Sequence, residues 1–189
     1  MEIYLLAIIP PAEIVDFVDK YRKKFAQRTS YKIPPHITIY PPFRSKFRSE
    51  DDLVNVLRKP LLGVLPMTIR LNSVDYFEGK NNVAFFKPDE VSTEFIKSLL
   101  VRVVDAIGKN VSNIYDDYKL DPENFIPHMT IAEKISATKL PSTKKQLNKI
   151  KIDKTFTINC IYLYKYSRKN KVWEEGARIV PVNNTPGSW

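Results

Sequence analysis

The sequence predicts one α+β domain made of two similar halves, and two observations lead to this prediction. The only two histidines of the chain lie in matching segments, Pro35-His36-Ile37-Thr38-Ile39 and Pro127-His128-Met129-Thr130-Ile131. The order strand, proline, helix, histidine strand, helix, strand also occurs twice along the 189 residues. That length fits a single domain, so we assign 1–189 to one bilobal unit, with an internal repeat at roughly 1–80 and 81–182 and a loosely ordered tail at 183–189.

The first half begins with an apolar strand at residues 3–9, which ends at Pro10 and Pro11. The first histidine strand runs through Tyr40 and is closed by two further prolines. Residues 49–57 have the acidic start of a helix, and 67–77 alternate as a strand does. Between the first two strands, a helix face is predicted by apolar residues three or four apart, namely Ile14, Phe17, Val18, Tyr21 and Phe25.

The second half repeats this order with a strand at residues 83–86, a helix marked by Phe95, Leu99, Val103 and Ile107, and the second histidine strand at 126–135. The connection before this histidine is longer than in the first half, and we place the extra residues within 108–124, as a lid or a specificity wall. The pattern then predicts a basic helix at 140–150, one long strand at 155–166 and a last strand at 171–180, hairpinned through 168–170.

The composition is that of a basic, soluble protein. Lys and Arg number 30 against 21 Asp and Glu, a formal charge of +9 that suits a polyanionic partner or a phosphate-bearing substrate. The single cysteine, Cys160, excludes an internal disulfide framework and a cysteine-based zinc site, and its apolar surroundings predict a buried core residue. No basic segment precedes the short first apolar run, so we expect no signal peptide, no membrane span and a reducing, cytoplasmic setting.

The two matching segments are suited to proton transfer. Residues two apart in a strand project from the same face, so His36 projects with Thr38 and His128 with Thr130. Each segment is therefore half of a site, with one imidazole and one hydroxyl on a stiff support. If a twofold axis relates the halves, the two imidazoles lie on opposite sides of one bound group.

A phosphodiester matches such a site. In-line displacement at phosphorus needs a base for the incoming water and an acid for the leaving oxygen, and two imidazoles of ordinary pKa serve both needs near neutral pH. The threonine hydroxyls can donate to the non-bridging oxygens as charge develops there. The scheme demands no metal and no other cofactor. As a working assignment His128 activates water and His36 protonates the leaving oxygen, although the nearly symmetric sequence does not choose between them.

Two His-x-Thr motifs, one in each half of a short chain, resemble those of the 2H phosphoesterase superfamily, of the 2′-5′ RNA ligase and cyclic phosphodiesterase type. The opening Leu5-Leu6-Ala7-Ile8 followed by prolines is also similar to the first strand of that family. The resemblance implies a bilobal fold with an antiparallel sheet in each lobe, helices outside and a catalytic groove between. It also implies metal-independent catalysis by His36, Thr38, His128 and Thr130.

Four neighbours are candidates for substrate binding. Tyr40 lies two residues after Thr38, on the same predicted face, where it could stack on a base or sugar. Lys134 lies on the predicted face of His128 and could hold phosphate. Phe43 and Arg44 follow the first motif past two prolines and are expected at the rim.

The favoured function is hydrolysis of 2′,3′-cyclic phosphates at RNA ends or in small nucleotides, by a monomeric enzyme. Three alternatives stay open. The same acid–base pair could cleave or form a 2′-5′ linkage. The chain could be an RNA-binding module that grips phosphate without turnover, or it could act on a phosphoester that is not a nucleic acid.

Overall fold

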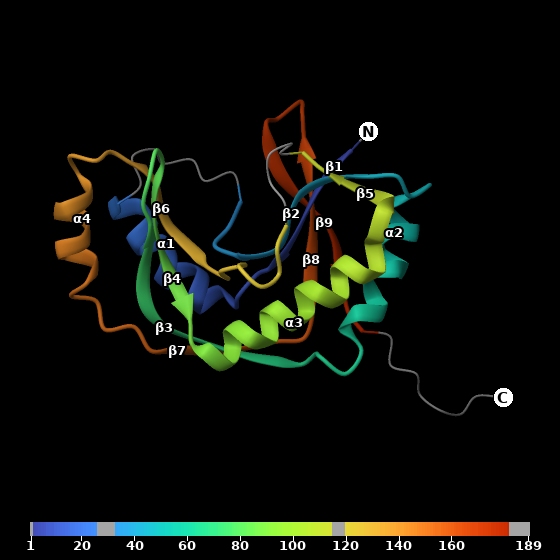
Figure 1. Ribbon diagram of the computed structural model, residues 1–189, viewed down its shortest axis with the longest axis horizontal. Helices are drawn as coiled ribbons and strands as arrows, with labels where there is room; N and C mark the ends of the chain where they lie inside the picture. Colours follow the sequence, from blue (N-terminus) through green and yellow to red (C-terminus); the bar gives the residue numbers. More distant parts are fainter. Residues whose placement is uncertain (1, 26–32, 115–119, 182–189) are drawn as a thin grey trace.

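The computed structural model describes residues 2–25, 33–114 and 120–181, so the predicted tail at 183–189 lies outside the described residues. These residues form four α-helices and nine strands (Figure 1). The helices are α1 (Ala12–Phe25), α2 (Glu50–Arg58), α3 (Glu90–Ile107) and α4 (Leu140–Leu147). The strands are β1 (Ile3–Ile8), β2 (Ile37–Ser45), β3 (Met67–Phe77), β4 (Asn82–Pro88), β5 (Val111–Asn113), β6 (Met129–Ile135), β7 (Lys154–Ile158), β8 (Ile161–Ser167) and β9 (Val172–Ile179).

The strands form an antiparallel sheet in two halves. Their order is β7-β3-β4-β6-β2-β1-β8-β9, and the short β5 pairs with the far end of β2. The two histidine strands, β6 and β2, are neighbours at the centre, where the residue pair Ile37 and Met129 joins the halves. Figure 1 shows one half on each side of this junction. The predicted α+β class with antiparallel strands on both sides is confirmed.

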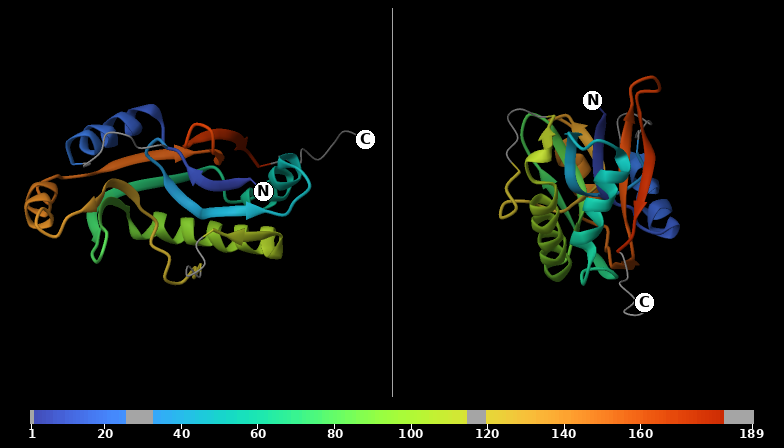
Figure 2. Two further views of the ribbon diagram at one scale, coloured as in Figure 1. Left: turned by 90° about the horizontal axis from the view of Figure 1, so that it is seen from above. Right: turned by 90° about the vertical axis from the view of Figure 1, so that its right-hand side faces the viewer.

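Each half of the sheet contains strands from both parts of the sequence. β3, from the first part of the chain, pairs with β4 and β7, whereas β8 and β9, from the last part, continue the sheet beyond β1. The helices likewise pack against strands from the other part of the sequence. α1 follows β1 but packs against β6, and α3 follows β4 but packs against β2 as well as β3 and β4. The two helices lie on opposite sides of the molecule (Figure 2).

Local sequence explains where the helices begin and which faces they bury. The Ser49 hydroxyl accepts a hydrogen bond from the backbone of Asp52 at the start of α2, and the Asp89 carboxylate caps α3 in the same way. Along α1 the buried positions are Ile14, Val18 and Arg22, each four residues apart. Within the described residues, no helix is both long enough and apolar enough to span a membrane.

Three predicted elements differ from the structure. The single strand expected at 155–166 is two strands in opposite halves of the sheet, because β7 pairs with β3 whereas β8 pairs with β1. The first histidine strand does not end at its prolines but continues to Ser45 through an irregular stretch. Part of the segment 108–124 is a 3₁₀ turn and β5, whose pairing extends the sheet; residues 115–119 lie outside the described residues.

Candidate active site

The two His-x-Thr motifs meet at the junction between the halves of the sheet. Ile37 pairs directly with Met129 across the antiparallel strands β2 and β6. In that register the residues on either side of the pair lie opposite each other, His36 beside Thr130 and Thr38 beside His128. Opposite residues in such a pair have Cβ atoms about 5 Å apart. The topology thus brings together two motifs that are 92 residues apart in the sequence (128 − 36 = 92).

The four side chains share the face of the sheet that is turned away from the main core. Ile37 and Met129 are fully buried in the core, as are Ile39 and Ile131. Because neighbouring residues in a strand point to opposite faces, the histidines and threonines project to the other side. All four are partly exposed there. The structure therefore has the predicted alternation of buried and partly exposed residues in both motifs.

The same backbone contact orients both imidazoles. The Nδ1 atom of His36 lies 2.8 Å from the carbonyl oxygen of Pro34, and that of His128 lies 2.8 Å from the carbonyl oxygen of Ile126. A carbonyl oxygen can only accept, so Nδ1 carries the hydrogen in both rings. In the neutral form this leaves each Nε2 as a proton acceptor, and in the charged form as a donor. The proline before each histidine, Pro35 or Pro127, fixes the backbone φ angle within this contact.

A bulge follows each threonine, in matching positions. Thr38 pairs with Ala7, but the next pair is Tyr40 with Leu6, so β2 has one extra residue there. Thr130 pairs with Phe85, and the next pair is Ala132 with Ala84, so β6 has its extra residue at the equivalent position. Bulges bend a strand and turn the residues beyond them to the other face. The two motifs thus match in a backbone irregularity as well as in sequence.

The bulge in β2 removes two of the predicted substrate contacts. Tyr40 is 9% exposed and belongs to the core cluster, with its ring 5.2 Å from that of Phe43 in an edge-to-face contact. Phe43 is fully buried. The prediction that Tyr40 lies on the face of His36 and that Phe43 lies at the rim is wrong, because it assumed unbroken alternation past Thr38.

The other two predicted contacts lie on the surface away from the junction. Arg44 is eight residues beyond His36 on β2, on the order of 20 Å along a strand, and pairs with Ile3 and Ser112. Lys134 is exposed and has a positive φ of 56° at the second irregularity of β6. The placement of Lys134 on the face of His128 again depended on alternation that the bulge interrupts. Neither residue is brought to the histidines by its strand.

His128 lies against two aromatic rings that the sequence did not indicate. The centroid of its ring is 5.0 Å from that of Phe77, edge to face, and 5.1 Å from that of Phe85. Phe85 is directly opposite Thr130 in the sheet and is almost fully buried. These rings limit the solvent around His128, and burial lowers the pKa of its imidazole against the opposing effect of the bond to Ile126.

His36 has a different electrostatic environment. Burial lowers the pKa of its imidazole to about 4, and the positive charges of Arg22 and His128 act in the same direction. The hydrogen bond to the Pro34 carbonyl acts against these effects. At neutral pH the His36 imidazole is therefore neutral, and its Nε2 can accept a proton.

This low pKa predicts a stability that depends on pH. Unfolded His36 takes up a proton near pH 6.5, whereas folded His36 does so only near pH 4, so the free energy of unfolding should decrease as the pH falls through this window. Urea denaturation at about pH 7 and about pH 4.5 measures the decrease. A His36→Gln variant should lose less stability over the same interval, and an equal loss in both proteins would contradict the prediction.

The face that carries the histidines and threonines continues across β1, β8 and β9. Ala7 pairs with Thr38 on one side and with Tyr162 on the other, and Tyr162 pairs with Arg178. The Arg178 guanidinium donates to the Cys160 sulfur, at 3.1 Å, and to the Asn159 side chain. A tyrosine and a cation therefore lie in the row of Thr38, and only the pairing of strands distant in sequence reveals them. Cys160 is a buried free thiol, and its predicted burial is confirmed.

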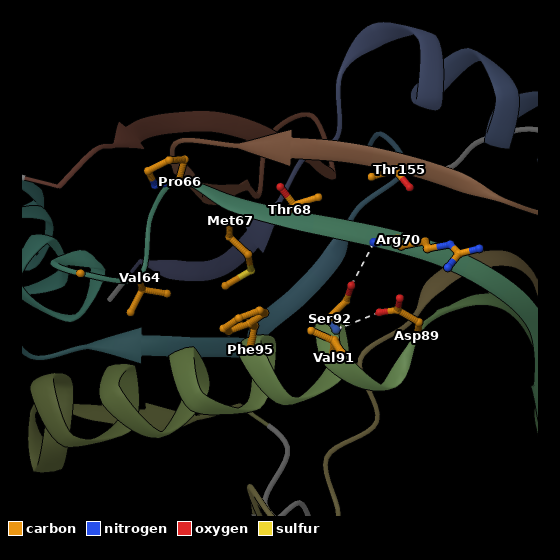
Figure 3. Close-up of a pocket in the computed structure, with 11 residues that line it drawn as sticks. Val64, Pro66, Met67, Thr68, Arg70, Asp89, Val91, Ser92, Phe95 and Thr155 are labelled. Carbon is orange, nitrogen blue, oxygen red and sulfur yellow. Dashed lines mark hydrogen bonds between the residues drawn. The ribbon is translucent and has the colours of Figure 1, made fainter.

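A separate cavity of about 560 Å³ lies between β3, β7 and the beginning of α3 (Figure 3). Two of its polar side chains bond to the backbone: the Ser92 hydroxyl accepts from the Arg70 amide at 2.9 Å, and the Asp89 carboxylate accepts from the Ser92 amide. Phe95, which the helical spacing placed on the buried face of α3, lines this cavity and is 51% exposed. The histidines do not line it. Among the residues that the structure describes, no three His, Cys, Asp or Glu side chains gather as a metal site.

Sequence comparison gives the family of the chain. The profile of the 2′-5′ RNA ligase superfamily matches residues 10–170. A relative from Staphylococcus aureus (strain Newman), which bears the name "Putative phosphoesterase", is 27% identical over 169 residues, covering 89% of this chain and 93% of the relative. A protein of the same organism, strain JH1, is 26% identical over the same share.

Solved structures share the fold at low sequence identity. The TT0787 protein of Thermus thermophilus superposes with a TM-score of 0.56 at 18% identity, over 95% of this chain and 97% of that one. Escherichia coli LigT in its apo form gives 0.54 at 14% identity, with the same coverage. Kluyveromyces marxianus Usb1 gives 0.52 at 12% identity, over 86% and 93%. With two His-x-Thr motifs at the centre of such a fold, and a profile match over most of its length, the chain belongs to the 2′-5′ RNA ligase superfamily, the 2H phosphoesterases.

Proposed function

We propose that this protein is a metal-independent phosphodiesterase that hydrolyses 2′,3′-cyclic phosphates of RNA ends or small nucleotides. The observation that supports it most is the matched orientation of the two imidazoles. Each ring donates from Nδ1 to a backbone carbonyl, which leaves both Nε2 atoms for chemistry on the shared face. One neutral and one protonated imidazole supply the base and the acid that displacement at phosphorus requires.

The threonines complete the proposed site. Thr38 lies beside His128, and Thr130 lies beside His36, so each hydroxyl is next to the imidazole of the other motif. A phosphoryl group held between the imidazoles would have both hydroxyls within reach of its non-bridging oxygens. Their hydrogen bonds strengthen as negative charge develops on those oxygens.

The ligands of the structural neighbours agree with a nucleotide substrate. One structure of E. coli LigT is complexed with 3′-AMP, at a TM-score of 0.53 and 15% identity, and the Usb1 structure contains uridine monophosphate. The charge of +9 on this chain also favours an anionic substrate. The free thiol of Cys160 fits the reducing, cytoplasmic setting that forms part of this proposal.

The pKa directions predict the pH dependence of catalysis. The value of kcat/KM should follow a bell-shaped curve, because one imidazole must be neutral and the other protonated in the free enzyme. Burial lowers both pKa values, so the maximum should lie below about pH 6.5. Initial rates at substrate concentrations well below KM, from about pH 4 to pH 9, measure the curve. A flat profile, with chemistry rate-limiting, would contradict catalysis by two histidines.

A substrate panel in EDTA tests the proposed reaction. It contains 2′,3′-cyclic nucleotides, a short RNA with a cyclic phosphate end, a 2′-5′-linked dinucleotide and its 3′-5′-linked isomer. We expect turnover of the cyclic phosphates, and the product isomer shows which oxygen leaves. Turnover of the 2′-5′ linkage alone would replace this proposal with the 2′-5′ phosphodiesterase or ligase activity. RNA binding that weakens with salt, with no turnover of any member, would indicate a binding module.

A further inference from the structure

A row of side chains leads from the candidate site to an exposed arginine at the edge of the sheet. The row starts at Thr38 and continues through Ala7 and Tyr162 to Arg178, with one residue on each of β2, β1, β8 and β9. Ala7 contributes only a methyl group, so no long side chain of this row separates Thr38 from Tyr162. Tyr162 is partly exposed and Arg178 is exposed. The row therefore offers an aromatic ring and a cation beyond the reacting group.

The burial of the flanking residues shows that this row faces away from the core. A residue in a strand points to the opposite face from both of its neighbours. On β1, β8 and β9 the neighbours of the row all belong to the core cluster or pack against it, namely Leu6, Ile8, Ile161, Leu163, Ala177 and Ile179. Tyr162 and Arg178 consequently project on the same side as Thr38 and the histidines.

Arg178 is held in place by groups that leave its charge uncompensated. Its Nε donates to the Cys160 sulfur and its Nη2 to the Asn159 amide oxygen, each at 3.1 Å, and the Cys160 thiol is also hydrogen-bonded to the Tyr162 hydroxyl. Among the described residues, no carboxylate forms an ion pair with Arg178. The bond to Cys160 is the largest of the effects that raise the pKa of the guanidinium, and the carboxylate of Glu175 makes the smallest contribution.

Another exposed arginine of the sheet is held differently. Arg70 forms two hydrogen bonds to the Asp153 carboxylate, at 2.7 and 3.1 Å, so its charge is compensated within the protein. Fixing an exposed arginine without a carboxylate costs side-chain entropy and brings no ion pair in return. What Arg178 keeps is a positioned charge, with an Nη1 that donates to none of the described residues. Such a planar, positioned guanidinium is suited to phosphate oxygens.

The distance of Arg178 from the site suits a phosphate further along an RNA chain. Neighbouring strands are about 4.8 Å apart, so three strand steps place Arg178 roughly 14 Å from Thr38. One phosphate group cannot contact both residues. Phosphates of a stacked strand follow one another by about 3.4 Å along its axis, so the guanidinium lies within the first few nucleotides of such a chain. Tyr162 lies between the two and can stack on a base of those nucleotides.

We propose that Arg178 and Tyr162 form a second subsite, which binds the RNA chain on the 5′ side of the cyclic phosphate. The guanidinium contacts a phosphate of the chain and the tyrosine ring contacts one of its bases. The preferred substrate is then the end of an RNA strand and not a free mononucleotide. This inference rests on the proposed phosphodiesterase function, whereas binding of an RNA chain at Arg178 can be measured without turnover.

Comparing two substrates tests the subsite. Arg178→Met should lower kcat/KM on a short RNA with a cyclic phosphate end by about tenfold or more, because a charged hydrogen bond to phosphate is lost. The loss on a 2′,3′-cyclic mononucleotide, which has no chain to bind, should be at least fivefold smaller. The matched control is Arg70→Met, which removes the compensated guanidinium and should affect neither substrate by more than about twofold. Equal losses of Arg178→Met on both substrates would overturn the proposal.

The salt dependence of binding tests the phosphate contact without turnover. The probe is the same RNA ending in a 3′-phosphate, and its dissociation constant is measured by fluorescence anisotropy from about 50 to 200 mM KCl. Each phosphate contact on a single strand contributes about 0.7 to the slope of log K against log salt, so Arg178→Met should reduce the slope by about this amount. An unchanged slope would overturn the contact. If the wild type turns over neither substrate, the phosphodiesterase proposal fails, and this slope alone decides the role of Arg178.

Two further substitutions test the surroundings of the guanidinium. Tyr162→Leu should weaken binding of the RNA probe about fivefold or more, whereas Tyr162→Phe keeps the ring and should retain most of the affinity. Equal losses in both variants would overturn stacking by Tyr162. Glu175→Gln removes a negative charge that acts on Arg178 and should tighten binding of the probe. Weaker binding in this variant would contradict an anion site at Arg178.

Discussion

His36→Ala and His128→Ala should each lower kcat/KM on 2′,3′-cyclic nucleotides by about 10²- to 10⁴-fold, the range typical of acid–base groups. The two rings are oriented alike, and the strands that follow them meet at the pair Ile37 and Met129. We therefore expect them to serve the same chemical step. The kcat/KM of the double variant should then be only slightly lower than that of the less active single variant. Steady-state assays in EDTA, with thermal melting to confirm folding, measure these losses.

The controls for this experiment are Lys134→Ala and Arg44→Ala. Sequence reasoning placed both residues in the site, whereas the structure places them on the surface outside it. We expect both variants to retain activity within about twofold of the wild type, because surface groups distant from the reacting atoms contribute little. Full activity in either histidine variant would refute two-histidine catalysis. A large loss in a control would place that residue in substrate binding.

Replacing either threonine hydroxyl should have the next largest effect. Thr38→Val and Thr130→Val keep the β-branched shape that suits a strand but remove the donor. Loss of one hydrogen-bond donor to a developing oxyanion costs about 10²- to 10³-fold in kcat. We expect a loss of this size in kcat with a smaller change in KM, measured on the same cyclic nucleotides, because the bond strengthens in the transition state.

Serine variants provide the comparison for the threonines. Thr38→Ser and Thr130→Ser retain a hydroxyl, so each should recover at least tenfold of the activity that its valine counterpart loses. Equal activity of the serine and valine variants would show that the β-branched shape of the threonine, and not its hydroxyl, matters. The threonines would then support the strands without contacting phosphate.

The sequence by itself determined the fold class, the partly exposed face of each motif and the four residues of the candidate site. Period-two alternation holds from His36 to Ile39 and from His128 to Ile131, because each motif precedes the first bulge of its strand. The duplication of the motif also implied two facing half-sites, and the pairing of Ile37 with Met129 brings them together. Short-range periodicity and a repeated pattern are properties that a linear sequence records.

The tertiary structure decided which other residues reach the site. One extra residue in β2 turns Tyr40 into the core. No local sequence pattern predicts this bulge, because a bulge depends on the partner strand. The division of residues 155–166 between β7 and β8 was likewise decided by pairing with β3 and β1. The helix face predicted from the apolar residues of α1 did not include Arg22, and only the packing of α1 buries this side chain and lets its charge act on His36. Electrostatic asymmetry depends on distances in space, so a nearly symmetric sequence could not contain it.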